Sequence, residues 1–282
     1  MKHLNGIRIL NLSINLPGPL AAARLAQFGA EVVKIEPPSG DPLALACRPY
    51  YDHLAAGQRV LALDLKDAAD RAELNTHLAA ADLLITANRP SALDRLGLNW
   101  GALHAQFPRL CHAALVGYAP PNDNRPGHDL MFQASNGLID PPHMPRTLVA
   151  DLGAAEQLVS AAMALLLHRA RTGESGYAQV AIEEAGEWFA LPVRYGITID
   201  GALSGALHTY GIYRARDGYI VLAALESHFL ERLVEALQLQ KTTRENLESI
   251  FLTRTACEWE TWALERNIPL VAVRLPGDSG MP

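Results

Sequence analysis

A strand–helix–strand pattern in the first 35 residues constrains the fold more than any other feature of the sequence. Ile7 to Leu12 is a short apolar run, and Glu31 to Ile35 is another. Between them, residues 20–28 form an Ala- and Leu-rich helical pattern. Two strands joined by a helix in this way form a βαβ unit, whose strands lie parallel in one sheet. The pattern recurs less regularly to residue 116, so we expect an α/β fold with a doubly wound parallel sheet.

The composition and the pattern of the sequence change after residue 195. Residues 196–206 are rich in Gly and Ala and are typical of a linker. Beyond them, Tyr210 to Arg214 and Tyr219 to Ala223 flank an Asp-Gly turn signal and predict a β-hairpin. We therefore expect a large α/β domain over 1–195, a linker over 196–208 and a smaller α+β domain over 209–282.

Composition excludes several classes of protein. Of the 282 residues, 49% are hydrophobic, which is enough for a folded core. The net charge of -6 and the lack of a basic run argue against a nucleic-acid partner. The three cysteines are far apart and the ten histidines form no HExxH, so we expect no metal site.

Localisation signals are equally sparse. The most apolar stretch, Leu158 to Leu167, lies between Gln157 and His168 and is too short to cross a bilayer. The N-terminus has no charged head followed by a long apolar core, so we expect no signal peptide. A cytoplasmic protein without a membrane partner is the expectation.

Short motifs that occur in a fixed order along about 230 residues point to a family. They include Pro17-Gly-Pro19, Val33-Lys-Ile-Glu-Pro-Pro38, Arg89-Pro-Ser-Ala-Leu-Asp-Arg-Leu-Gly-Leu98, Arg125-Pro-Gly-His-Asp129, Val149-Ala-Asp151 and Tyr213-Arg-Ala-Arg-Asp-Gly218. In this order they resemble the family III CoA-transferases (CaiB/BaiF type), a superfamily that also contains the α-methylacyl-CoA racemases. The resemblance implies a Rossmann-like large domain, a smaller domain and an interlocked homodimer. It also implies acyl-CoA and a carboxylic acid as substrates, with coenzyme A entering as substrate and no tightly bound cofactor.

Asp151 is the central candidate for catalysis. The sequence predicts a short strand over Thr147 to Ala150 that runs into a long helix from Leu152, with Asp151 as the helix N-cap. A helix N-terminus would keep this carboxylate ionised, as a nucleophile requires. By resemblance, Asp151 is the transferase nucleophile that attacks the acyl thioester. In the racemases the same position is an acid/base.

Three further residues are candidates for the catalytic site. From the residues alone, His128 and Asp129 are a polar pair at a loop end, and Glu226 is a solvated residue at a helix start. By resemblance, His128 is the racemase proton shuttle opposite Asp151, whereas Asp129 matches an acid that assists transferases. Glu226 matches a residue of the racemase-like members that supports the catalytic pair from the small domain.

The resemblance also places coenzyme-contacting positions at Leu63, Lys66, Arg89 and Arg95. Without it, Leu63 is a core residue and the other three are ordinary surface charges. Arginine binds phosphate well because its planar guanidinium group donates two parallel hydrogen bonds to the phosphate oxygens.

The sequence departs from the family in several places. Thr86-Ala87-Asn88 replaces the Glu-Asn-Phe of many members, and Leu16 stands where several transferases have Gln. We also expect that the C-terminal segment which returns to the first domain is missing.

Three functions remain open from the sequence. The first is a CoA-transferase that forms an aspartyl-CoA intermediate on Asp151. The second is an acyl-CoA racemase that uses His128 and Asp151. The third is a catalytically poor CoA-binding subunit.

Overall fold

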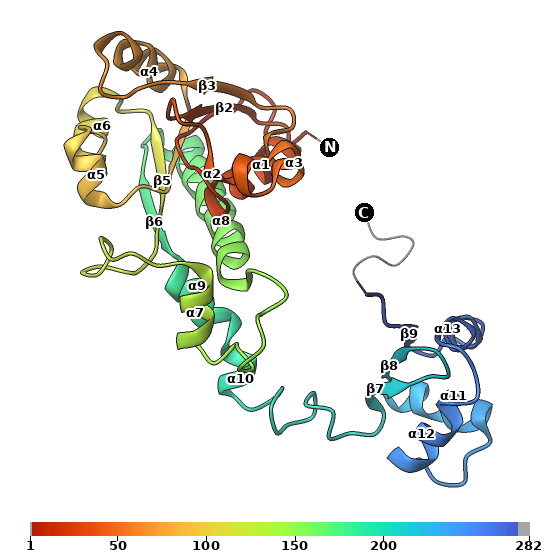
Figure 1. Cartoon of the computed structure of the whole chain (residues 1–282). Helices are drawn as coiled ribbons and strands as arrows, with labels where there is room; N and C mark the ends of the chain where they lie inside the picture. The colour runs from red at the N-terminus through yellow and green to blue at the C-terminus, as the bar shows by residue number, and fades with distance from the viewer. Residues whose placement is uncertain (1, 276–282) are drawn as a thin grey trace. The chain divides into compact units, whose positions relative to one another are not determined.

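The chain forms two compact units in the computed structural model, Met1–Leu191 and Pro192–Pro282, which are coloured along the chain in Figure 1. The structure describes residues 2–275. The proposed domain limits of 195 and 209 remain predictions, because the contacts divide the chain but do not define a linker.

Within the described part of the first unit, six parallel strands form one sheet in the order β3-β2-β1-β4-β5-β6 (Figure 1). The strands are β1 (Arg8–Asn11), β2 (Glu31–Glu36), β3 (Arg59–Ala62), β4 (Leu83–Thr86), β5 (Cys111–Val116) and β6 (Tyr177–Ala181). This is the order of doubly wound nucleotide-binding sheets, and it confirms the predicted α/β class. The order reverses between β1 and β4, where such sheets open a crevice at their carboxyl edge.

Alternate residues of the strands enter two separate cores. Ile9, Leu83 and Ile85 pack against the helices on one face, whereas Leu10 and Leu84 pack against those on the other. Strands buried on both faces are typical of parallel sheets.

The first face is covered by α1 (Pro17–Gln27) and α8 (Val149–Thr172), and the second by α4 (Ala68–Ala80), α5 (Pro90–Arg95) and α6 (Trp100–Gln106). The remaining helices of this unit are α2 (Pro42–Ala46), α3 (Arg48–Ala55), α7 (Asp129–Ser135) and α9 (Ile182–Phe189). A short helix, α10 (Leu191–Arg194), follows at its end.

Two helices differ from the sequence prediction at their starts. Helix α1 begins at Pro17 rather than at residue 20, because Pro17 occupies the first helical position, where a missing N–H costs nothing. Helix α8 begins at Val149, so the predicted strand over Thr147 to Ala150 is wrong. Among residues 2–275, α8 is the one helix long and apolar enough to cross a membrane. It packs in the core against β5 and β6.

The C-terminal end of α8 is fixed to the amino edge of the sheet. Arg169 Nη1 donates to the carbonyls of Asp82 (3.0 Å) and Arg109 (2.9 Å), and Nη2 donates to Asp82 Oδ1 (2.8 Å). Asp82 Oδ2 accepts from the backbone N–H of Arg8. One guanidinium thus joins the helix to the starts of β1, β4 and β5.

We expect Arg169→Gln to lower the free energy of unfolding by about 2 kcal/mol, because charge-assisted hydrogen bonds at a partly buried carboxylate are lost. Urea unfolding followed by circular dichroism measures this. The control is Arg171→Gln, which removes the same charge from an exposed position two residues further along α8. Equal stability of the two variants would contradict the assignment.

The described part of the second unit is a small α+β unit. Its antiparallel sheet has the order β7-β8-β9, from β7 (Tyr210–Arg214), β8 (Tyr219–Ala223) and β9 (Leu270–Ala272). The predicted hairpin is therefore confirmed. Helices α11 (Ser227–Leu237), α12 (Arg244–Phe251) and α13 (Ala256–Leu264) bury Trp259, Phe251 and Leu233 against this sheet.

Candidate active site

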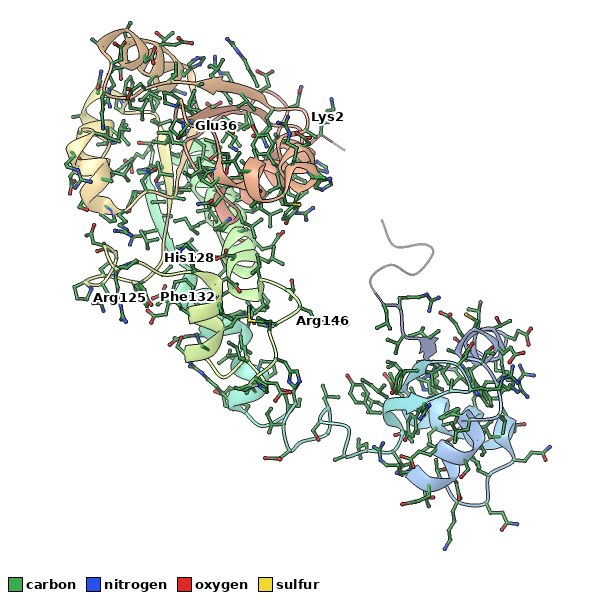
Figure 2. All side chains as sticks on the ribbon, in the orientation of Figure 1. Lys2, Glu36, Arg125, His128, Phe132 and Arg146 are labelled. Carbon is green, nitrogen blue, oxygen red and sulfur yellow. The ribbon has the colours of Figure 1, made fainter. Side chains whose placement is uncertain are left out.

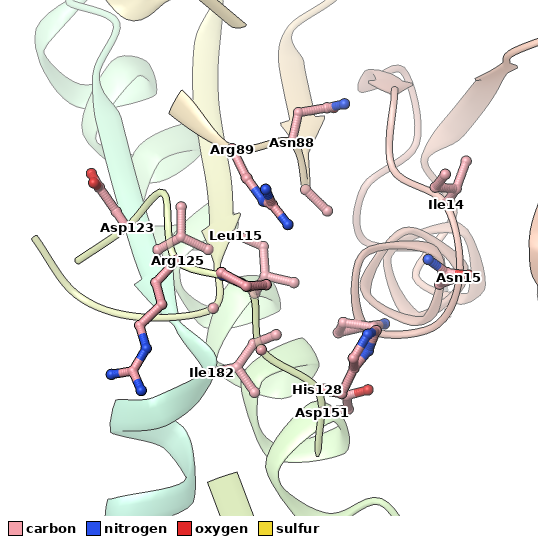
Figure 3. Close-up of a pocket in the computed structure, with 16 residues that line it drawn as sticks. Ile14, Asn15, Asn88, Arg89, Leu115, Asp123, Arg125, His128, Asp151 and Ile182 are labelled. Atoms are coloured by element: carbon pink, nitrogen blue, oxygen red, sulfur yellow. The ribbon is translucent and has the colours of Figure 1, made fainter. Parts of the chain in front are cut away.

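A cavity of about 380 Å³ opens at the carboxyl edge of the parallel sheet (Figure 3). Its walls come from the segments that follow β1, β4 and β5, together with the first turn of α8 and the start of α9. The residues that line it include Ile14, Asn15, Asn88, Arg89, Leu115, Asp123, Arg125, His128, Asp151 and Ile182. Ligands bind at this edge in doubly wound sheets, beside the point where the strand order reverses.

The N-terminus of α8 is capped by the side chain of Asp129, which starts α7. Oδ1 of Asp129 accepts from the backbone N–H groups of Ala150 (2.9 Å) and Asp151 (3.0 Å). Oδ2 accepts from Gln133 Nε2 at 2.5 Å. Asp129 is only 4% exposed, so three donors hold a buried carboxylate. Two of the free N–H groups at the helix start are thus satisfied by a side chain of another helix.

This cap corrects the prediction for Asp151. The N-cap residue of α8 is Leu148, which offers no polar side chain, and Asp151 lies in the first turn. The donors that the sequence assigned to Asp151 are bound by Asp129 instead. Sequence reasoning missed this because the capping residue lies 21 and 22 positions upstream of the N–H groups that it accepts from.

The protonation of Asp151 follows from the same arrangement. Burial first, and the neighbouring Asp129 carboxylate second, raise the pKa of Asp151 to about 7. The expectation that the helix N-terminus keeps this carboxylate ionised is therefore wrong: near pH 7 both the protonated and the ionised form of Asp151 are populated. Such a pKa suits a group that must gain and lose a proton at physiological pH.

The raised pKa has a consequence for stability. Between pH 4 and 7, Asp151 is protonated in the folded protein but ionised in the unfolded chain. Because the folded state binds more protons, the free energy of unfolding falls as the pH rises through this window. We expect Asp151→Asn to exceed the wild type in stability by about 2 to 4 kcal/mol at pH 8, since one pKa unit corresponds to about 1.4 kcal/mol. Near pH 4 the two proteins should be equally stable.

Urea unfolding of both proteins at pH 4 and pH 8 measures this difference. Asp140→Asn serves as the control, because Asp140 is an exposed carboxylate. A pH-independent difference between Asp151→Asn and the wild type would contradict the raised pKa.

His128 lines the same cavity as Asp151, from the N-cap position of α7 (Figure 3). The preceding Gly127 fixes where the loop passes: a Cβ there would lie 2.4 Å from Phe132 Cζ and 3.0 Å from the Tyr118 ring. Both rings are buried. Figure 2 shows His128, Phe132 and Arg125 at this end of the first unit. Glycine therefore allows the close approach that brings His128 to the cavity.

A second cavity, of about 240 Å³, adjoins the first and shares Ile14 and Asn88 with it. It lies over the ends of β1, β2 and β3 and is largely apolar, with Leu63 and Lys66 in its lining. Leu63 also belongs to the core beneath the sheet. The two cavities are thus neighbours along the carboxyl edge, and together we call them the groove.

Some of the predicted site residues line the two cavities and others do not. Leu63 and Lys66 line the second cavity, and Arg89 lines the first. Arg95 lines neither and is exposed on α5. Glu226 is an exposed N-cap residue of α11 in the second unit, so its role in catalysis stays a prediction.

Sequence reasoning also missed a buried charge cluster behind the cavity wall. Lys34 Nζ lies 2.7 Å from Glu36 Oε1 and 2.5 Å from Asp41 Oδ2, with all three side chains buried. Asp41 Oδ1 accepts from the N–H of Asn15, which has φ +67° and lines the cavity. The sequence feature that could have pointed to this cluster is the pair of charged residues within the strand pattern Val33-Lys-Ile-Glu36. The cluster holds the turn after β1 in its left-handed conformation.

Comparison with known proteins identifies the family that this fold and site define. The model of CoA-transferase family III matches residues 4–279, and the chain belongs to this family.

Among its relatives, the probable fatty acyl-CoA transferase Rv3272 of Mycobacterium tuberculosis is 32% identical over 64% of this chain and 50% of its own length. Human alpha-methylacyl-CoA racemase is 27% identical over 91% of this chain and 74% of its own length. The chain thus spans about half the length of the mycobacterial relative. The crystal structure of a CaiB/BaiF family protein from Brucella suis matches with a TM-score of 0.82 at 20% identity, over 96% of this chain and 84% of that one.

Proposed function

We propose that the protein transfers CoA from an acyl-CoA thioester to a carboxylic acid, with Asp151 as the nucleophile. The observation that carries the proposal is the position of the Asp151 carboxylate in the cavity at the carboxyl edge of the sheet. That cavity adjoins the largely apolar second cavity, which Leu63 and Lys66 line. A groove with cations and apolar walls fits the phosphates and the pantetheine arm of CoA.

The reaction begins with ionised Asp151 attacking the thioester carbonyl. CoA leaves as the thiolate, and a mixed anhydride of Asp151 and the acyl group forms. The thiolate then attacks the Asp151 carbonyl, which releases the first acid and leaves an aspartyl-CoA thioester. The acceptor carboxylate attacks this thioester and expels the CoA thiolate, which leaves a second mixed anhydride between Asp151 and the acceptor. The thiolate then attacks the acyl carbon of the acceptor, which gives the new thioester and frees the Asp151 carboxylate. Each step exchanges one acyl bond for another, so no redox group is needed.

In this mechanism, the remaining residues bind and orient. Asp129 fixes the first turn of α8 through two backbone hydrogen bonds and so fixes Asp151. Arg89 and Lys66 are assigned to the phosphates of CoA. Leu16 is 6% exposed and packs with Ala23 and Leu54, so it does not replace a polar group at the acyl oxygen.

A second candidate is favoured by the place of His128. An acyl-CoA racemase needs two groups that exchange protons at one α-carbon, and His128 and Asp151 line the same cavity. The oxygens of Asp129 accept from three donors, which leaves it a positioning role in either reaction.

One incubation separates these candidates. 2-Methylacyl-CoA and an acceptor acid are incubated with the protein in D2O, and all thioesters are followed by mass spectrometry. We expect the thioester of the acceptor to appear. We expect Asp151→Asn to lower its rate by about 10³-fold or more, with binding of CoA retained, because the nucleophile is lost. Hydroxylamine should trap the wild-type intermediate as a hydroxamate on Asp151.

Other outcomes contradict the transferase. Gain of one α-deuterium without transfer would make the racemase the correct assignment, and His128→Gln should then abolish the exchange. Binding of CoA with neither reaction, over a panel of acceptor acids, would identify a CoA-binding subunit.

The pH dependence tests the environment of Asp151. Transfer requires the ionised carboxylate, so kcat/KM should rise with pH through a midpoint near 7. We expect Asp129→Asn to lower this midpoint, because the like charge beside Asp151 is removed while the amide oxygen still accepts from the two N–H groups. Profiles of kcat/KM from pH 5 to 9 measure it. An unchanged midpoint would show that Asp129 does not set the pKa.

A further inference from the structure

Two backbone donors at the start of α8 are already occupied. Attack on a thioester carbonyl places a negative charge on the carbonyl oxygen, and an oxyanion of this kind is stabilised by hydrogen-bond donors that are fixed in advance. Backbone N–H groups at a helix start often supply them. In α8, however, the N–H groups of Ala150 and Asp151 donate to Asp129 at 2.9 and 3.0 Å. This leaves the donor to the side chains of the cavity wall.

Asn15 carries a neutral donor on that wall. It lines the same cavity as Asp151, and it is an exposed residue at the turn between β1 and α1. Within the part of the chain that the structure describes, its side-chain amide makes no hydrogen bond. An amide offers two N–H donors and adds no charge beside the Asp151 carboxylate. The Asn15 amide is therefore available to a carbonyl oxygen.

The residues that follow Asn15 and Asp151 in the chain share one hydrophobic cluster. Leu16 is a buried member of this cluster, and Leu152 packs against it. In the view of Figure 3, Asn15 and Asp151 lie on the same side of the cavity as His128. The shared cluster therefore holds Asn15 and Asp151 in neighbouring parts of the cavity wall.

The backbone of Asn15 is fixed from behind this wall. Its N–H donates to Oδ1 of Asp41 at 2.9 Å, and Asp41 is buried in an ion pair with Lys34. The φ of Asn15, +67°, lies in the left-handed region, which asparagine adopts more readily than most other non-glycine residues. A donor on a fixed backbone stabilises an oxyanion without reorganisation during the reaction.

The second amide in the lining of this cavity, Asn88, is placed differently. It follows β4 and lines both cavities, whereas Asn15 lines only the first. In the view of Figure 3, Asn88 lies next to Arg89 and across the cavity from Asp151. Of the two amides, Asn15 is therefore the one that fits a carbonyl at Asp151.

We propose that Asn15 is a catalytic residue whose side-chain amide donates a hydrogen bond to the carbonyl oxygen of the acyl-CoA thioester. The Asp151 carboxylate adds to the carbonyl carbon, an electron pair of the C=O bond moves to the oxygen, and Asn15 stabilises the oxyanion. The tetrahedral intermediate then collapses, the C–S bond breaks and CoA leaves as the thiolate. This inference rests on the proposed transfer of CoA to a carboxylic acid.

Kinetics of two substitutions test this role. Asn15→Gly removes the amide and keeps a residue that tolerates a φ of +67°, whereas Asn15→Asp keeps the shape and loses the donor. We expect both to lower kcat by about 10²- to 10³-fold, the effect of removing one oxyanion donor. Asn267→Gly is the matched control, because Asn267 also has a positive φ, +52°, and lines neither cavity. It should keep the wild-type kcat.

Infrared spectroscopy separates this hydrogen bond from a structural role. Isobutyryl-CoA, labelled with carbon-13 at the thioester carbonyl, is bound to Asp151→Asn, and the C=O stretching band is recorded. A hydrogen bond to the carbonyl oxygen lowers the frequency of this band. We expect the double variant Asn15→Gly/Asp151→Asn to bind the thioester and to show the band at a higher frequency than Asp151→Asn does.

The outcomes separate this inference from the function on which it rests. Transfer by the wild type with an equal kcat in Asn15→Gly, or an unchanged band in the double variant, would overturn the role of Asn15 and leave the transferase intact. No transfer by the wild type to any acid of the acceptor panel would overturn the transferase and this inference together.

Discussion

The carboxylate of Asp129 accepts two backbone N–H groups at the start of α8 and one amide from Gln133. These bonds determine where α8 begins, because Leu148 offers no cap of its own. They also determine the position of Asp151 in the first turn and, through the charge of Asp129, contribute to its protonation. The start of α8 and part of the pKa shift of Asp151 therefore depend on a single buried side chain. A change at Asp129 would alter the helix start and the electrostatics of the cavity together.

The rest of the cavity depends on how the sheet is connected. Because the strand order reverses between β1 and β4, the segments after these strands diverge and leave room for a ligand. On one side, the buried cluster of Lys34, Glu36 and Asp41 holds the turn at Asn15. On the other side, Gly127 lets the chain pass close to Phe132. Buried ion pairs add little net stability, so the value of the cluster lies in fixing one conformation of this wall.

Features that local sequence patterns encode were predictable from the sequence. The alternation of apolar runs and helices predicted the parallel sheet, and the Asp217-Gly218 pair predicted the hairpin of β7 and β8. Ordered motifs predicted the family. They also selected Leu63, Lys66, Arg89, His128 and Asp151, all of which line the groove.

Features that depend on distant contacts were not predictable. The cap of α8 comes from α7, so no local pattern around Asp151 could reveal it. A strand was expected at Thr147 because a short apolar run alone does not distinguish a strand from the first turn of a helix. Arg95 was selected by motif, but the end of α5 turns it to solvent. The charge pattern of Val33-Lys-Ile-Glu36 gave no indication that Asp41 would complete a buried cluster.

Helix α8 connects the two edges of the sheet. Arg169, near its C-terminus, is joined to Asp82 at the amino edge, and Asp151 stands at the cavity on the carboxyl edge. Eighteen helical steps separate them, which is about 27 Å at 1.5 Å per residue. A continuous helix transmits an axial displacement at one end to the other, where a small misplacement of a reacting group slows chemistry strongly. If Asp151 acts as proposed, substitutions at the amino edge can therefore alter turnover without changing any residue that lines the cavity.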